Sequence, residues 1–127
     1  SCMRVYNELR QRGIKVLPGG DYGFAWNPIG TNARDLEHFV NLFGYSDAQA
    51  LRAATQLGGE LMGMNIGLVK EGYLADLLLV NGDPTQDVSI LQDSDNFLMI
   101  MKDGNYHKEP QLEKIARLKL APAAAAE

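Results

Sequence analysis

The sequence predicts an α/β protein, and three observations indicate that class. A short apolar run at residues 14–17 ends in Pro-Gly-Gly and reads as a buried strand. Residues 32–63 carry two stretches in which apolar side chains recur at helical spacing. After residue 65 the pattern changes to short β-type runs separated by Gly, Asp and Pro, which is typical of a β meander.

Size and composition limit the possible classes of protein. The chain has 127 residues, of which 46% are hydrophobic and 22% charged, as in one globular domain. A complete α/β barrel has about 250 residues. A net charge of -4 without a basic stripe argues against nucleic acid as a partner, and no apolar run reaches the roughly 20 residues of a membrane span. The single cysteine, Cys2, fits a reducing compartment, so we expect a cytoplasmic protein.

The N-terminal part predicts a helix, a strand and a loop in succession. Apolar and aromatic side chains recur at helical spacing in residues 2–12, and Gly13 is suited to end that helix. The strand at 14–17 follows. Residues 22–31 are rich in aromatic residues, Gly and Pro, which predicts a loop with large side chains available for contact.

Two further helices are predicted between residues 32 and 63. Asn32 is expected to cap the first helix, and Gly44 to end it. Its apolar face would comprise Leu36, Phe39, Val40 and Phe43. Ser46 and Gln49 have the spacing of a capping box and open the second helix, which Gly63 closes. The expected inner stripe of this helix is Ala50, Leu51, Ala54, Leu57, Gly58 and Leu61.

The C-terminal part predicts short strands and a last helix. The β-type runs lie at residues 66–69, 75–80, 88–91 and 97–102. Asp103-Gly104 is a strong signal for a hairpin turn, and residues 105–108 form the return strand. A last helix over 111–120 precedes an alanine-rich tail.

The strand at 14–17 has no partner among its neighbours in sequence. A single strand between helices cannot satisfy the hydrogen bonds of its own backbone edges. It must pair with strands from outside this stretch, either from another chain or from a missing part. The order of elements therefore predicts an incomplete domain.

Asp21 is the candidate catalytic residue. It follows Pro-Gly-Gly just beyond the C-terminal end of the predicted strand, where parallel α/β proteins build their active sites. The alternative is an Asp that bonds its own backbone amides in a strand-end turn. In the following loop Tyr22, Phe24 and Trp26 either line a substrate pocket or simply cover the end of the fold. His38 is expected on the solvated side of its helix.

Several segments in this order carry a resemblance to a known family. They are Gly19-Gly-Asp-Tyr-Gly-Phe24, Asn32-Ala-Arg-Asp-Leu-Glu37, Ala50-Leu-Arg-Ala-Ala-Thr55, Glu71-Gly-Tyr-Leu-Ala-Asp76 and Gly82-Asp-Pro84. Together they resemble the C-terminal third of the amidohydrolase superfamily, with most likeness to its imidazolonepropionase-like and prolidase-like members. The resemblance runs from about residue 1 to residue 108, nearly the whole chain.

The resemblance implies a fold in three parts. The family has a (β/α)8 barrel and a small β-sandwich built from both chain ends. Residues 1–65 would then be the C-terminal portion of the barrel, with its last strand and the following helices. Residues 66–108 would supply the C-terminal strands of the sandwich, and residues 109–127 a helix and an Ala-rich tail.

The resemblance also implies a chemistry and a metal. These hydrolases cleave C–N bonds in amides, dipeptides or cyclic amides with a divalent metal, here expected to be zinc. Asp21 matches the aspartate after strand eight, which binds the metal and shuttles a proton from the nucleophilic water. The family's His-x-His pair is absent, and neither His38 nor His107 is placed beside Asp21 by its spacing. A catalytic zinc normally takes three protein ligands, so we expect the isolated chain to bind no metal and to be inactive.

Two functions from different classes follow. The first is a fragment of a metal-dependent amidohydrolase that acts on a small amide or dipeptide and associates with a missing N-terminal part. The second is a non-catalytic fragment that forms a homo-oligomer through exposed strand edges and the barrel-facing side of its helices. Neither involves nucleic acid or a membrane.

Overall fold

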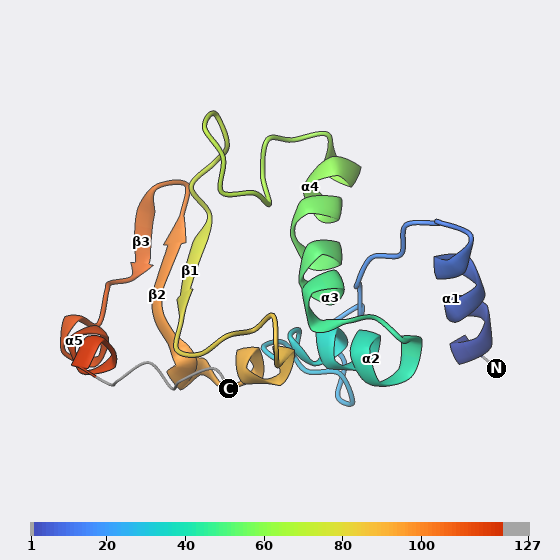
Figure 1. Ribbon diagram of the computed structural model, residues 1–127, viewed down its shortest axis with the longest axis horizontal. Coiled ribbons are helices and arrows are strands. Elements are labelled where there is room, and N and C mark those ends of the chain that lie inside the picture. The colour runs from blue at the N-terminus through green and yellow to red at the C-terminus, as the bar shows by residue number, and fades with distance from the viewer. Residues whose placement is uncertain (1, 121–127) are drawn as a thin grey trace.

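The computed structural model describes residues 2–120. Helices α1 to α4 lie on one side of the molecule, and the sheet lies with α5 on the other (Figure 1). In chain order the elements are α1 (Cys2–Gln11), α2 (Arg34–Phe43), α3 (Asp47–Ala54), α4 (Gln56–Met62), β1 (Leu77–Val80), the 3₁₀ helices η1 (Val88–Gln92) and η2 (Ser94–Asn96), β2 (Phe97–Lys102), β3 (Asn105–Lys108) and α5 (Leu112–Leu120).

Helix α1 ends at Gly13, as predicted. Gly13 has φ +75°, a left-handed conformation that other residues adopt only at a cost. Its N–H donates to the carbonyl of Arg10 over 2.9 Å, and the N–H of Ile14 donates to the carbonyl of Leu9 over 3.0 Å. This pair of bonds is a Schellman motif, which satisfies the last carbonyls of the helix.

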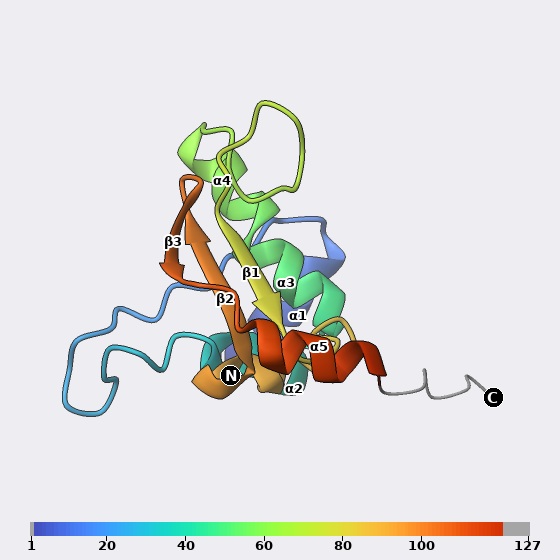
Figure 2. The same ribbon diagram turned by 90° about the vertical axis from the view of Figure 1, so that its left-hand side faces the viewer.

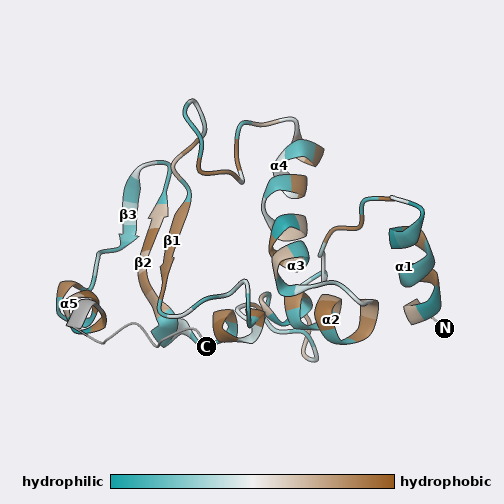
Figure 3. Ribbon diagram, viewed as in Figure 1, coloured by the Kyte–Doolittle hydropathy of each residue, from teal (hydrophilic) through white to brown (hydrophobic). Residues whose placement is uncertain are grey.

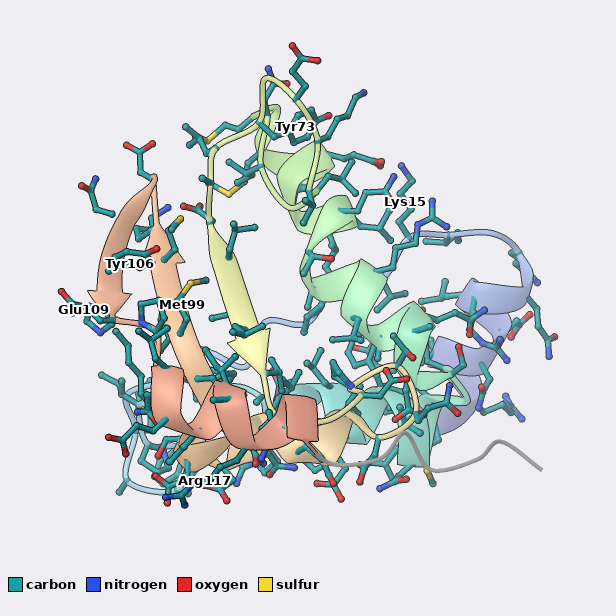
Figure 4. All side chains as sticks on the ribbon, turned by 60° about the vertical axis from the view of Figure 1, so that its left-hand side comes forward. Lys15, Tyr73, Met99, Tyr106, Glu109 and Arg117 are labelled. Atoms are coloured by element: carbon teal, nitrogen blue, oxygen red, sulfur yellow. The ribbon has the colours of Figure 1, made fainter. Side chains whose placement is uncertain are left out.

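The predicted strand at 14–17 is wrong for this structure, which leaves the segment without a β partner. From Lys15 to Tyr22, no backbone group bonds to another backbone group within residues 2–120. Helices α3 and α4 stand between this segment and the sheet (Figure 1). Lys15 instead reaches α4 through an ion pair, with its Nζ 2.7 Å from Oε2 of Glu60 (Figure 4). An apolar run without a neighbouring strand cannot form a ladder.

Helix α2 has the predicted apolar face but a different start. Leu36 and Phe39 are buried, and Gly44 ends the helix with φ +72°. The prediction that Asn32 caps the helix is wrong, because the N-cap is Ala33 and makes no side-chain bond. The side chain of Asn32 instead accepts the N–H of Gly30 over 3.3 Å. The side chain of Asn32 is therefore engaged in the turn before the helix and does not cap it.

The predicted second helix is divided at Thr55 into α3 and α4. The capping box is confirmed, since Ser46 and Gln49 each bond the other's backbone N–H. The inner stripe is partly wrong, because Leu61 is 74% exposed while Ala53 is buried. After the break, the buried residue of α4 is Gly59.

The loop after α4 packs back against α4 and against Thr55. A Cβ at Gly59 would lie 2.3 Å from the carbonyl oxygen of Ile66, so this glycine lets the loop pack directly on the helix. A Cβ at Gly67 would lie 2.2 Å from the carbonyl oxygen of Thr55. Gly67 also has φ +81°, which is incompatible with the predicted strand at 66–69.

The sheet contains β1, β2 and β3 in that order, with both pairs antiparallel. Leu78 pairs with Ile100, and Ile100 with Lys108. The predicted strand at 75–80 is confirmed in shorter form, whereas 97–102 and 105–108 match β2 and β3. Asp103 and Gly104 have φ values of +48° and +75°. Positive φ at both turn residues is what a tight two-residue hairpin needs.

The predicted strand at 88–91 is wrong, because these residues form the 3₁₀ helix η1. The Asp87 side chain accepts the N–H of Ser89 over 2.9 Å and starts the helical turn. Val88 and Leu91 then enter a core built mainly by α2 and α3. The buried members of that core are Leu36, Phe39, Ala50, Ala53, Val88 and Leu91.

Large apolar side chains also remain on the surface of the described residues. Ile29 is 83% exposed and Val69 is 90% exposed. Figure 3 shows hydrophobic residues along β1 and β2 as well as in α2. Figure 2 shows α5 crossing one end of the sheet, where it leaves much of β1 uncovered. Apolar side chains that gather into one exposed patch usually mark a site of contact with other protein, whereas single ones are common on any surface.

No helix within residues 2–120 combines the length and apolar character needed to cross a bilayer. The alanine-rich tail at 121–127 lies outside the described residues. The three-part division at residues 65 and 108 stays a prediction.

Candidate functional site

Asp21 lies on the surface at the end of the extended segment that follows α1. Its φ is +47°, in the left-handed region that few residues other than glycine occupy. Aspartate tolerates this conformation better than most residues. The backbone therefore turns sharply at the predicted catalytic residue.

A hollow of about 460 Å³ opens beside Asp21. Phe24 and Trp26 stack across 5.7 Å on its wall, with their rings 9° from parallel. The residues that line the hollow are Gly20, Asp21, Phe24, Trp26, Asn27, Arg34, Asp35 and His38. Two carboxylates, one guanidinium and one imidazole thus face the same space as two aromatic rings.

Tyr22 lies on the other side of Asp21. It lines a second hollow of about 430 Å³, which Asp21 also borders, together with Ala33 and Leu36. The structure therefore separates the three predicted substrate-binding aromatics. Phe24 and Trp26 share one hollow with Asp21, whereas Tyr22 shares the other.

The hydroxyl of Tyr22 is held by the start of α2. It donates to the carbonyl oxygen of Asn32 over 3.3 Å. Burial of the ring, with the Asp35 carboxylate nearby, raises the pKa of Tyr22 to about 12. The phenol therefore stays protonated at neutral pH and acts as a hydrogen-bond donor.

Sequence reasoning missed three residues at this site. His38 is exposed as expected, but it borders the same hollow as Asp21, because one turn of α2 carries it past Arg34. Asn27 and Arg34 bond each other, with Arg34 Nη2 2.7 Å from Asn27 Oδ1. Asn27 lies in a loop and Arg34 at the start of a helix, and their spacing in the sequence does not indicate a functional site. Asn27-Pro28 is a typical turn pair, which predicts a turn and no more.

The described residues do not form a metal site by themselves. No cluster of three or more His, Cys, Asp or Glu side chains suited to a metal ion occurs among residues 2–120. His107, on β3, is not among the residues that border either hollow beside Asp21. Asp21 could offer one carboxylate to a metal whose other ligands lie elsewhere.

Solved structures and curated proteins resemble most of this chain. A Bifidobacterium longum protein assigned as a prolidase is 27% identical with a TM-score of 0.77, covering 95% of this chain and 30% of its own. A Xaa-Pro dipeptidase crystallised with methionine in the active site is 28% identical with a TM-score of 0.74, covering 84% of this chain and 25% of its own. Ochratoxinase of Aspergillus niger is 26% identical over 113 residues, which are 87% of this chain and 23% of that protein.

The matches cover most of this chain but only a part of each relative. The chain spans about a quarter of the length of the curated relatives that it matches. The model of the amidohydrolase family matches residues 3–106, which include Asp21, both hollows and the whole of β1 and β2. This chain belongs to the amidohydrolase family.

Proposed function

We propose that this chain supplies the C-terminal part of a metal-dependent hydrolase that cleaves C–N bonds, with Asp21 as a metal ligand and proton carrier. The observation that carries the proposal is the family match over residues 3–106 together with the position of Asp21 between two hollows. Asp21 is exposed at a sharp backbone turn, where its carboxylate is accessible to substrate and water.

In the complete enzyme, residues 14–17 would form the last strand of a (β/α)8 barrel, and α2 to α4 would be the helices that follow it. The backbone groups from Lys15 to Tyr22, which lack backbone partners within residues 2–120, support this placement. Neighbouring barrel strands would satisfy them. The three-stranded sheet would be the C-terminal share of the β-sandwich.

In this enzyme Asp21 acts as a general base. Its ionised carboxylate accepts a proton from the attacking water and returns it to the nitrogen of the leaving group. One carboxylate does not make a metal site, and the remaining ligands, including the family's histidines, come from outside residues 2–120. Zinc is the metal we expect in the complete enzyme.

Phe24 and Trp26 are the proposed substrate contacts on the side of the larger hollow. Stacked rings at an open hollow suit an apolar or aromatic part of a substrate. Tyr22 would contribute its ring to the second hollow, since its hydroxyl already donates to Asn32. The names ochratoxinase and Xaa-Pro dipeptidase among the relatives support an amide or dipeptide as the substrate class.

The test uses the protein expressed from its whole reading frame, with the 127-residue chain in parallel. Metal content is measured, and hydrolysis is assayed on dipeptides, N-acylated amino acids and cyclic amides. Substitution of Asp21→Asn should lower kcat about 10²- to 10⁴-fold, as expected for loss of a general base. Asp95→Asn, at an exposed 3₁₀ turn, is the matched control. An Asp21→Asn enzyme with undiminished kcat would contradict the proposal.

The exposed apolar side chains favour a second candidate, a non-catalytic chain that associates with copies of itself. Trp26 is 81% exposed, and Leu61 and Val69 are also largely exposed. Sedimentation of the 127-residue chain over a range of concentrations tests this candidate. A stable monomer with a cooperative melting transition would count against self-association.

A further inference from the structure

We propose that Asn27 and Arg34 form a positioning pair that fixes the orientation of Asp21, an inference that rests on the proposed role of Asp21. Asn27 Nδ2 donates to the carbonyl oxygen of Gly20, the residue immediately before Asp21. Arg34 Nη2 in turn donates to Asn27 Oδ1 over 2.7 Å. The pair connects the first residue of α2 to the peptide bond that leads into Asp21.

The amide of Asn27 can take only one orientation in this chain of bonds. A carbonyl oxygen only accepts and a guanidinium only donates, so Nδ2 must face Gly20 and Oδ1 must face Arg34. The backbone of Asn27 is also engaged, since its carbonyl accepts the N–H of Gly23 over 2.9 Å and its N–H donates to Phe24 over 3.0 Å. Every polar group of Asn27 therefore has a partner, which holds the side chain in place.

The peptide between Gly20 and Asp21 needs such support. Its carbonyl oxygen and its N–H lie in one plane, so a bond that fixes the oxygen also fixes the plane from which Asp21 projects. No backbone N–H from Lys15 to Tyr22 donates to another backbone group within residues 2–120. Asp21 also holds a φ of +47°, which local preference alone does not maintain.

The Cα of Gly20 is also closely packed. A Cβ at Gly20 would lie 2.6 Å from Cε2 of Tyr22 and 2.9 Å from Oδ2 of Asp35. Any side chain at this position would displace the ring or the carboxylate. Gly20 is thus confined between these two groups and the amide of Asn27.

Arg34 ties the pair to the hydrophobic core. It begins α2, whose Leu36 and Phe39 are buried two and five positions further along. Within residues 2–120 the guanidinium makes no ion pair, and its one hydrogen bond goes to Asn27. Its Nε is buried without a partner among these residues. Among the described residues, Arg34 is therefore hydrogen-bonded to Asn27 and not to a carboxylate.

The isosteric change Asn27→Asp removes the bond to Gly20 and keeps the bond from Arg34. An aspartate would still accept from Arg34, but it would present an acceptor to the carbonyl of Gly20 and lose that bond. In the complete enzyme we expect kcat to fall about 10- to 100-fold with KM almost unchanged, as for a misplaced catalytic group. Because both residues act in one chain of contacts, Asn27→Ala with Arg34→Ala should cost no more than Asn27→Ala alone.

Matched controls separate positioning from general damage. Asn41→Asp changes an exposed asparagine of α2, and Arg12→Ala an exposed arginine after α1; both should leave kcat unchanged. Each variant is also measured for metal content and thermal stability. Asp21→Asn is the reference for loss of the catalytic group.

The outcomes distinguish this inference from the proposed function. If Asp21→Asn keeps full activity, the proposed function fails. If Asp21→Asn is inactive while Asn27→Asp keeps its kcat, the positioning pair is wrong. A rise in KM with constant kcat would also overturn it, because that result indicates direct contact with substrate. A fall in thermal stability at constant kcat of the folded enzyme would reduce the pair to a structural role.

Discussion

The carboxylate of Asp47 accepts the backbone N–H of Val88 over 2.8 Å and joins two segments 41 residues apart in sequence. Asp47 is the first residue of α3, and Val88 is the first residue of η1. Val88 is itself 2% exposed and belongs to the core. This bond therefore connects the start of η1 to the start of α3.

We expect Asp47→Ala to lower the free energy of unfolding by about 1–3 kcal/mol, because the N–H of Val88 would lose its partner in a partly buried site. Asp47→Asn keeps an acceptor oxygen and should restore most of the loss. Urea denaturation of both variants measures the difference. If Asp47→Asn lost as much stability relative to wild type as Asp47→Ala, the charge and not the hydrogen bond would account for the loss.

Adjacent glycines in α4 should respond to alanine in opposite directions. A Cβ at Gly59 would lie 2.3 Å from the carbonyl oxygen of Ile66, so Gly59→Ala should destabilise the chain by about 1–3 kcal/mol through overpacking. A Cβ at Gly58 meets nothing within 4 Å. Gly58→Ala should therefore stabilise the helix by about 0.5–1 kcal/mol. Thermal melts of the two variants provide the comparison, and a shift in the same direction would refute it.

The stability of the hairpin should fall in acid because of Asp76. Hydrogen bonds from Lys102 Nζ and from the N–H of Asp103 hold the pKa of Asp76 below its ordinary value of 3.8. The folded state then binds a proton less readily than the unfolded state. The stabilisation is present above pH 3.8 and is lost as the pH falls through the lower folded pKa.

Urea denaturation from neutral pH to well below 3.8 measures this loss. Asp76→Asn should flatten the acid limb of the stability curve. Asp95→Asn is the control, since the Asp95 side chain accepts no hydrogen bond within the part of the chain that the structure describes. An acid limb that is the same in wild type and Asp76→Asn would contradict the assignment.

Tyr22 should ionise later than an ordinary tyrosine in the folded chain. Its pKa is raised to about 12 from 10.0, chiefly by burial and then by Asp35. The unfolded chain ionises first, so the contribution of Tyr22 to stability is complete below pH 10.0 and declines as the pH rises above it. In an absorbance titration, Tyr22→Phe should remove the last phase of ionisation. Tyr106→Phe, at a 54% exposed position, should leave that phase in place.

Features that depend on a few neighbouring residues could be predicted from the sequence. Gly13 and Gly44 end their helices, and Ser46 with Gln49 forms the capping box. The Asp103-Gly104 turn also forms where it was expected. Each depends on a conformation or a hydrogen bond within one turn, so local residue chemistry decides it.

Features that depend on distant contacts could not be predicted in this way. Residues 88–91 have the composition of a strand, but Asp47 and the helical core hold them as a 3₁₀ helix. The loop after α4 likewise packs on Gly59 and lies against Thr55, contacts that no pattern within one turn indicates.

At the candidate site, too, only the features that depend on neighbouring residues could be predicted. Asp21 could be identified from its place after an apolar run and from family resemblance. Asn27 and Arg34 could not, since their role arises only when a loop folds back on the start of α2.

The unpaired backbone from Lys15 to Tyr22 has a consequence for hydrogen exchange. Amide protons with no acceptor exchange with solvent almost as fast as in an unfolded chain, whereas those in α2 and α3 are protected. Within residues 2–120, the segment that carries Asp21 would therefore take up deuterium before α2 and α3. Slow exchange at Val16 and Leu17 in the complete enzyme would report directly that neighbouring strands have closed around Asp21.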